Sequence, residues 1–347
     1  MEQILGQHYV QSLHKGDLMR FISYIFAVLS NYAHNLHYLG KFDLKASHQD
    51  VLSNQNQKIA CLQEELKNCK KNILELNAIV DAQFAEQYRE ELSYLKQCQD
   101  LAIFPYPQQK TITHQIDADF DNAKKLPYVI HNNKRLYFPQ NFSIQNAIDK
   151  YKYFIETENL LGGNYTTKAP HQYQTDTFKI EENDILLDIG CAEALVALDA
   201  IEKVKKVYLF EGDKTWFPAL QATFEPYNDK VVLIKKFISD HNDEENITLD
   251  AALKDETSQS FFVKMDIEGA ETLVLSSSKD FFTSTRKIKL ACCTYHKADH
   301  ADIISQKLQE WNYKYEFSDG YMLFTYDLNF VPPYFRHGLI RGKNFID

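Results

Sequence analysis

Three charged side chains surround the end of one apolar stretch. The segment FFVKMDIEGAE, residues 261–271, contains Lys264, Asp266 and Glu268 at this point. Charges that are half-buried at a strand end must be paired or take part in chemistry. A carboxylate there can orient a hydroxyl group, accept its proton or stabilise a nearby cation. We therefore expect Asp266 and Glu268 to be catalytic; the alternative is a helix cap with a salt bridge to Lys264.

A second candidate for acid–base chemistry is His296, in the segment CCTYHKADH of residues 292–300. It follows another apolar stretch, and a histidine pKa near ~6.5 suits a general base. The alternative is a purely structural histidine. His296, Asp299 and His300 have side chains of the metal-ligand type. No other run of ligands supports a metal, so we predict no metal site.

The segment DILLDIGCAEALVALDA, residues 184–200, has the pattern of a ligand site. A buried strand, an acidic residue, a glycine and a helix follow one another, as at the carboxyl ends of open α/β sheets. The glycine lets a ligand approach the backbone, and free N–H groups at the helix start favour a carboxylate. We expect Asp188, Gly190, Cys191 and Glu193 to bind a cofactor.

Further residues indicate the type of cofactor. Glu211 and Gly212 end the segment VYLFEG, and an acid at the end of a second strand can accept both ribose hydroxyls. A dinucleotide fold requires G-x-G-x-x-G, whereas this loop has only Gly190, which disfavours an NAD-dependent oxidoreductase. Ser239 and Asp240 follow the third predicted strand. They are placed to contact an adenine amine, unless they belong to a solvated loop.

Alternating strands and helices must position these residues. Strands are predicted at residues 185–189, 206–211, 231–237, 260–267 and 287–295, and helices at 192–203, 215–225, 271–276 and 301–311. This rhythm indicates a parallel sheet with helices on both faces. A hairpin with a D-G turn is predicted between 312–317 and 321–326. We expect an α/β protein with a seven-stranded, mostly parallel Rossmann-like methyltransferase sheet that ends in an antiparallel hairpin.

A helical N-terminal region, residues 1–101, precedes this domain. In residues 1–40 an apolar face indicates a buried helix or, alternatively, a helix that binds a membrane surface or a partner. In residues 51–101 a heptad seam continues past Val80 with the spacing of a stutter. It favours equally a coiled-coil homodimer and an intramolecular helical hairpin in which this segment packs on the first one. The seam comprises Ile59, Leu62, Leu66, Cys69, Ile73, Leu76 and Val80.

A connector, residues 102–164, joins the helical region to the predicted methyltransferase domain at 165–347. It contains a predicted hairpin with strands at 128–131 and 135–138, and then a helix at 146–161. The following loop contains Tyr165, His171 and Tyr173, which either cover a site or belong to a plain linker.

Composition limits the partners. The net charge of −10 over 347 residues argues against nucleic-acid binding, because phosphates require a basic surface. The six cysteines form no C-x-x-C pair, so we expect a reducing cytoplasm. The run FISYIFAVL has about half of the ~20 apolar residues of a membrane span, so we expect no integral membrane segment.

At the segments LLDIGCAEALVAL, VYLFEGD, ITLD, FVKMDIEGAETLVL and CTYHK, the sequence resembles the FkbM family of methyltransferases that use S-adenosylmethionine (SAM). The resemblance implies a Rossmann-like sheet, SAM as the methyl donor, and O-methylation of a hydroxyl on a sugar, a glycan or a related natural product. Family members commonly have a glycine where this chain has Ala194. The alternative is a methyltransferase-like binding or scaffold protein with little or no catalysis.

Overall fold

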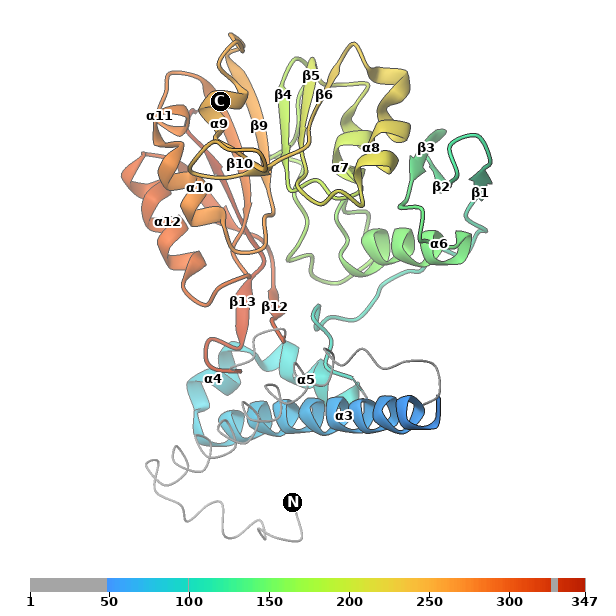
Figure 1. The fold of residues 1–347 in the computed structure, drawn as a ribbon. Helices are drawn as coiled ribbons and strands as arrows, with labels where there is room; N and C mark the ends of the chain where they lie inside the picture. The colour runs from blue at the N-terminus through green and yellow to red at the C-terminus, as the bar shows by residue number, and fades with distance from the viewer. Residues whose placement is uncertain (1–48, 99, 326–329, 347) are drawn as a thin grey trace, which may run out of the picture. The chain divides into compact units, whose positions relative to one another are not determined.

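The computed structural model describes residues 49–98, 100–325 and 330–346. The chain forms two compact units (Figure 1). The helical unit comprises Met1–Pro105 and Leu323–Phe335, and the sheet unit comprises Tyr106–Met322 and Arg336–Asp347. The apolar helix predicted within residues 1–40 lies outside the described residues.

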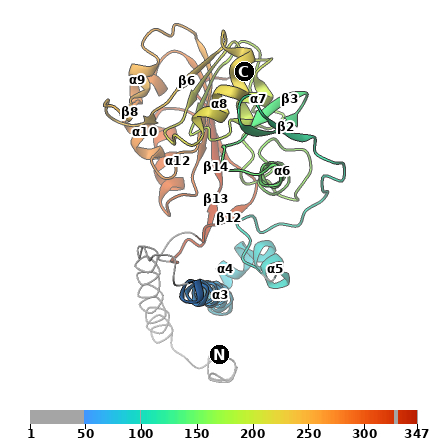
Figure 2. The same ribbon diagram turned by 45° about the vertical axis from the view of Figure 1, so that its right-hand side comes forward.

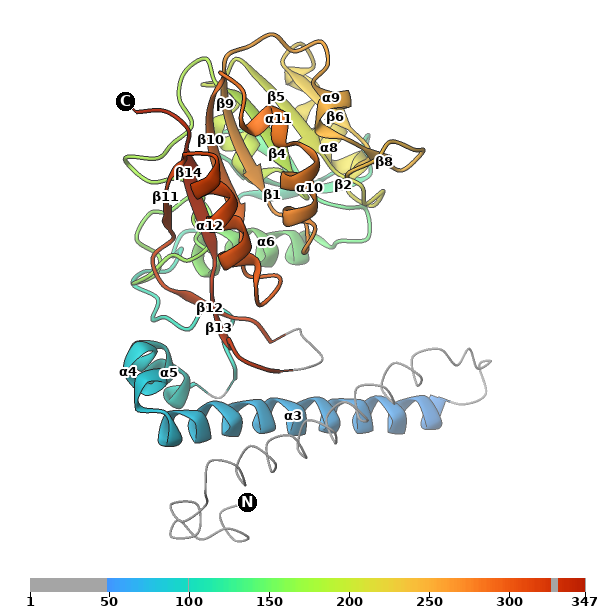
Figure 3. The same cartoon turned by 90° about the vertical axis from the view of Figure 1, so that its left-hand side faces the viewer.

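The helical unit contains a long helix, α3 (Gln49–Val80), followed by α4 (Ala82–Gln87) and α5 (Arg89–Gln97) (Figure 3). The seam predicted to continue past Val80 is divided between these helices. The carboxylate of Asp81 accepts the N–H groups of Gln83 and Phe84 at 3.0 and 3.1 Å, which ends α3 and starts α4.

The ammonium of Lys71 on α3 donates to the carbonyl of Cys98, just after α5, at 2.8 Å. The chain therefore folds back on itself within residues 49–98. The predicted alternatives, packing on the first segment and a homodimer, both stay predictions, because the first segment lies outside the described residues. In the described part of the chain, we find no helix whose length and apolar character would let it cross a membrane.

Among the described residues, seven strands form the main sheet in the order β11-β14-β10-β9-β4-β5-β6. All neighbours are parallel except β14, which runs antiparallel to both β10 and β11. The predicted mostly parallel seven-stranded sheet is thus confirmed. Its strands are β4 (Ile185–Ile189), β5 (Lys206–Phe210), β6 (Val231–Ile234), β9 (Ser260–Met265), β10 (Lys287–Cys293), β11 (Lys314–Phe317) and β14 (Leu339–Lys343).

The predicted pairing around the D-G turn is wrong. The antiparallel partner of β11 is β14, with Phe317 opposite Ile340. The segment after the turn forms β12 (Tyr321–Leu323), which pairs with β13 (Phe335–His337) in a separate ribbon. A strand between two others must be buried on both faces. In β14, Leu339 and Ile340 are fully buried, which fits this inner position.

Helices cover both faces of the sheet (Figures 1 and 2). One face packs against α7 (Leu195–Ala200) and α8 (Phe217–Phe224). The other packs against α10 (Glu271–Ser277), α11 (Lys279–Phe282) and α12 (His300–Glu310), and against Leu249 of α9 (Leu249–Ala252). Successive strand residues alternate between the two faces, so both cores are apolar. The strand predicted at 231–237 ends early, and Phe237–Ile238 (β7) pairs instead with Asn246–Ile247 (β8).

A small sheet precedes the main one. The predicted hairpin is confirmed as β2 (Leu126–His131) and β3 (Lys134–Tyr137), and β1 (Ala118–Asp121) pairs with β2. Helix α6 (Ile144–Lys152) follows and continues into a π-helical turn, Tyr153–Thr157. The chain then crosses a loop, residues 158–184, to reach β4.

Candidate functional site

A cavity of about 230 Å³ lies at the carboxyl ends of β4 and β9 in the sheet unit. Its walls come from the two strand ends, the loops before and after β4, the end of α6 with the turn that follows it, the start of α7, Trp216, and Tyr295 after β10. The predicted site residues in its lining are Asp188, Gly190, Cys191, Glu193, Asp266 and Glu268. The sheet therefore brings together the cofactor and catalytic candidates of two segments that are far apart in sequence.

A buried ion pair forms one wall of the cavity. Asp188 and Lys264 are register partners on β4 and β9, and their charged groups lie 3.1 Å apart. The Lys264 ammonium also donates to the carbonyl of Gly190 at 2.6 Å. Burial raises the pKa of Asp188. Burial would lower the pKa of Lys264, but the carboxylates of Asp188 and Asp266 outweigh it and raise that pKa. The predicted salt bridge of Lys264 therefore exists, but its partner is Asp188.

The loop after β4 has an unusual backbone. Gly190, Ala192 and Ala194 have φ values of 73°, 45° and 59°. This left-handed conformation delays the start of α7 to Leu195, so the prediction that the helix begins at residue 192 is wrong. Ala194, where the family that the sequence resembles commonly has a glycine, is itself left-handed and buried. Its methyl group does not line the cavity.

Glu193 is a buried carboxyl group of the cavity that has no cationic partner at salt-bridge distance among the described residues. Its side chain is buried, and burial raises the pKa of Glu193 to about 7. A cationic group of a ligand would supply this missing charge.

The remaining predicted cofactor residues lie outside the cavity lining. The carboxylate of Glu211 accepts the N–H of Ala192 at 2.8 Å and that of Asp213 at 2.7 Å, so it holds the loop after β4. Ser239 is buried, whereas Asp240 is exposed and pairs with His241 at 2.8 Å.

Gly212 packs against an aromatic ring. A Cβ at this position would lie 2.2 Å from the ring of Phe237, which is 52% exposed. The absent side chain of Gly212 is therefore explained by the close approach of Phe237.

Asp266 is the centre of a polar network. Its Oδ2 accepts from the Tyr173 hydroxyl at 2.9 Å and lies 3.4 Å from His171 Nε2. Its Oδ1 lies 3.4 Å from both the Tyr295 hydroxyl and His296 Nε2. Burial would raise the pKa of Asp266, but His171 and nearby positive charges lower it well below its usual range. An ionised carboxylate of this kind orients donors well and is a weak proton acceptor.

His296 lies behind Asp266 and outside the cavity lining. Its Nδ1 lies 2.8 Å from Glu271, a fully buried carboxylate that also accepts the N–H of Ile267 at 3.0 Å. Burial would lower the pKa of His296, but Glu271 and Asp266 outweigh it and raise that pKa. Glu268 reaches the cavity with a side chain that is 91% exposed.

Sequence reasoning did not identify all residues of the network. It left His171 and Tyr173 as a possible cover, and it gave Glu158 and Cys293 no role. Glu158 lines the cavity and pairs with His171 Nδ1 at 3.0 Å. Of these two residues, only Cys293 could have been found from the sequence. Side chains alternate along a strand, so Cys293 lies on the same sheet face as Ala291, and Ala291 is the register partner of Lys264.

The sheet order defines the class of fold. The antiparallel strand β14 lies beside β10, the last of the parallel strands. Such a strand distinguishes the Rossmann-like methyltransferase sheet from the dinucleotide-binding sheet, whose six strands are ordered 3-2-1-4-5-6. The chain therefore has a Rossmann-like methyltransferase fold.

No protein-family model matches the sequence, and no curated protein matches it. A solved structure of methyltransferase FkbM from Methylobacillus flagellatus KT matches with 19% identity over 48% of this chain and 44% of that chain, at a TM-score of 0.37. The matched part thus spans less than half of that protein.

Two other solved structures are similar over comparable lengths. Precorrin-6y C5,15-methyltransferase from Geobacter metallireducens GS-15 matches with 14% identity over 48% of this chain and 81% of that chain, at a TM-score of 0.31. The 23S rRNA methyltransferase ErmE matches with 10% identity over 50% and 66%, at a TM-score of 0.32.

Proposed function

We propose that the protein is a SAM-dependent methyltransferase. The observation that carries this proposal is the cavity at the carboxyl ends of β4 and β9, beside a loop with a single glycine. In open α/β sheets ligands bind at this edge. The loop lacks the glycines that a pyrophosphate requires, and SAM contains no pyrophosphate.

The residues of the cavity fit the charges of SAM. The buried carboxyl group of Glu193, whose pKa is raised to about 7, would gain a countercharge from the amino group of the cofactor. Glu211 lies outside the cavity lining and holds the loop after β4 through its carboxylate, and we propose that the same carboxylate also accepts the ribose hydroxyls. Bound SAM supplies an electrophilic methyl group on a sulfonium.

We further propose O-methyl transfer to a hydroxyl of a sugar, a glycan or a related natural product. Asp266 would orient the acceptor together with the hydroxyls of Tyr173 and Tyr295, which already donate to its carboxylate. Holding the acceptor oxygen in line with the methyl group supplies most of the rate enhancement in such a transfer. The lowered pKa of Asp266 favours this positioning role over proton abstraction.

Isothermal titration calorimetry with SAM tests cofactor binding. We expect wild-type protein to release heat, and we expect at least a tenfold loss of affinity in Glu193→Gln and in Glu211→Ala. Asp213→Asn is the control, since Asp213 is exposed and caps the next turn through Thr215 at 2.9 Å. No heat with the wild type, or equal heats in all variants, would reject the assignment of SAM.

Turnover separates an enzyme from the scaffold alternative. A panel of sugar and glycan acceptors is mixed with SAM, and release of S-adenosylhomocysteine is measured. Release with one acceptor class supports the enzyme. Binding of SAM with no release from any acceptor supports a methyltransferase-like binding protein.

A further inference from the structure

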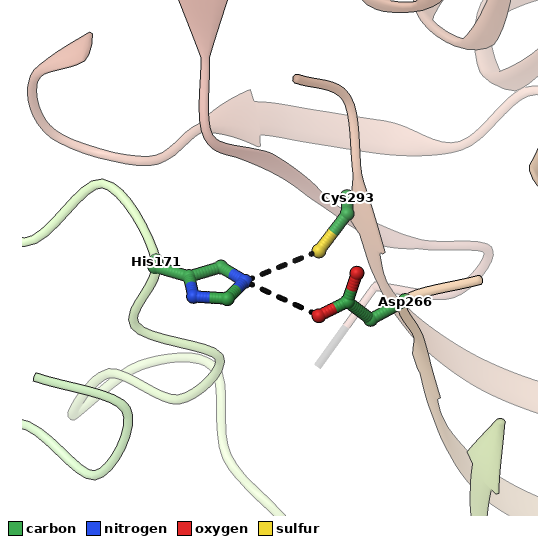
Figure 4. A group of neighbouring side chains, drawn as sticks. All are labelled: His171, Asp266 and Cys293. Carbon is green, nitrogen blue, oxygen red and sulfur yellow. Dashed lines mark hydrogen bonds and ion pairs between the residues drawn. The ribbon is translucent and has the colours of Figure 1, made fainter. Parts of the chain in front are cut away.

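Four polar atoms converge on one point between the loop before β4 and the ends of β9 and β10. They are His171 Nε2, Asp266 Oδ2, Cys293 Sγ and the Tyr173 hydroxyl. The imidazole nitrogen lies 3.4 Å from Asp266 and 3.5 Å from Cys293 (Figure 4). The Tyr173 hydroxyl lies 2.9, 3.1 and 3.6 Å from the aspartate, histidine and cysteine atoms.

The two separations from His171 match edges of a tetrahedral metal site. Zinc binds imidazole nitrogen and carboxylate oxygen at roughly 2.0–2.2 Å and thiolate sulfur at about 2.3 Å. At tetrahedral angles these bond lengths place the nitrogen about 3.4 Å from the oxygen and about 3.6 Å from the sulfur. The observed values for His171 are 3.4 and 3.5 Å.

The surroundings of His171 also suit a ligand. Its other ring nitrogen, Nδ1, lies 3.0 Å from the carboxylate of Glu158. Metal-bound histidines almost always donate their second N–H to such a group, which fixes the tautomer and directs the free lone pair toward the metal. His171 is 3% exposed, so its orientation is set by packing as well.

We propose that His171, Asp266 and Cys293 bind a divalent cation of the zinc type. His171, Tyr173 and Asp266 also line the cavity, and the Tyr173 hydroxyl lies at the fourth vertex of the site. A substrate oxygen that displaced this hydroxyl would complete the pattern of catalytic zinc sites, which have three protein ligands and one exchangeable position.

The neighbouring group of Asp266, Glu271 and His296 is a weaker candidate. Glu271 lies against Nδ1 of His296, whereas Asp266 faces Nε2 on the other side of the ring. The carboxylate of Glu271 is also engaged by the backbone N–H of Ile267. This group therefore has the arrangement of a buried ion-pair network.

A role for the cation in catalysis rests on the proposed function, whereas cation binding does not. The cation would bind the acceptor hydroxyl oxygen and lower its pKa, so that the proton leaves to solvent. The oxygen would then form a bond to the methyl carbon of SAM. The carbon–sulfur bond would break, with its electron pair retained on sulfur.

Titration of the metal-free full chain with Co²⁺, without SAM, tests the site. Cobalt bound by a thiolate gives a charge-transfer band in the near ultraviolet, and tetrahedral cobalt gives intense visible bands. We expect one Co²⁺ per chain with both features. Cys293→Ser should abolish the charge-transfer band and weaken binding at least tenfold.

Cys292→Ser is the matched control. Cys292 is buried on the same strand but packs in the core on the opposite sheet face. This variant should keep the band. Absence of Co²⁺ binding by the wild type, or the same band in Cys293→Ser as in the wild type, would overturn the site, and so would binding without a charge-transfer band.

A second variant covers the case in which Cys293→Ser does not fold. Glu158→Gln keeps the shape of the side chain that orients His171, and loss of such a partner typically weakens metal binding by about 10- to 100-fold. Unchanged Co²⁺ affinity in this variant would count against the site. Cation binding with no SAM binding would reject the proposed function alone, and SAM binding with no cation binding would reject the site alone.

Discussion

Replacing Gly190 by alanine tests how tightly the loop after β4 is held against β9. Gly190 has a φ of 73°, and a Cβ there would lie 1.9 Å from the carbonyl oxygen of Asp266. This oxygen belongs to backbone that is fixed by the hydrogen bond from the Asp266 N–H to Ile189 at 3.0 Å. The clash therefore cannot be relieved by rotation of a side chain.

Two terms set the expected cost of Gly190→Ala. The left-handed conformation costs a non-glycine residue about 1–2 kcal/mol, and forcing an extra carbon into a packed region costs about 1–3 kcal/mol. Together they lower the free energy of unfolding by about 2–5 kcal/mol. For a unit of this size the midpoint of thermal unfolding should fall by roughly 4 to 20 °C.

Thermal and urea unfolding, followed by circular dichroism, measure this cost. Gly269→Ala is the control, because Gly269 has a φ of 99° but the nearest atom to its Cβ would be the flexible Lys297 Cε at 3.1 Å. It should lose only the conformational term of about 1–2 kcal/mol. Equal destabilisation by the two substitutions would refute the argument from the close approach of Gly190 to Asp266.

Three further predictions concern the same region. Ala194→Gly should change the free energy of unfolding by less than about 1 kcal/mol, because relief of the left-handed backbone is offset by a lost buried methyl and a more flexible unfolded chain. SAM affinity should not change, and a tenfold change in calorimetry would contradict this.

The pKa of Glu193 is raised to about 7, so the folded state binds this proton more tightly than the unfolded state does. The stabilisation that the proton provides is therefore fully present below about pH 4.5 and is lost as the pH rises through 7. Glu193→Gln should be up to about 3 kcal/mol more stable than the wild type at pH 8 and similar at pH 4 in urea unfolding; equal stability at both values would contradict it. Lys264→Met should lower the free energy of unfolding by about 3–5 kcal/mol, because it leaves the Asp188 carboxylate unpaired. Adding Asp188→Asn should recover much of this loss in urea unfolding, whereas additive losses in the double variant would reject the pairing.

Much of the sheet unit follows from local patterns. Runs of apolar residues fix the positions of β4, β5, β9 and β10, because a strand covered on both faces requires them. The sequence alone therefore places the ends of β4 and β9 side by side, and the cavity lies there. The loop containing Glu193 and the carboxylate of Asp266 were found in this way.

Other features depend on contacts between distant segments. The choice of β14 over β12 as the partner of β11 depends on which segment can be buried between two strands, which a D-G turn does not specify. The change of spacing after Val80 was interpreted as a stutter of one seam, whereas the side chain of Asp81 caps a new helix at this point.

By itself the sequence determined the parallel core and the acidic strand ends, because both arise from the period and polarity of neighbouring residues. Only the tertiary structure decided that Lys264 pairs with Asp188. Only it showed that His171, more than 90 residues before Asp266, meets this carboxylate beside Cys293. Such contacts depend on the path of the loop before β4, residues 158–184, which no local sequence pattern specifies.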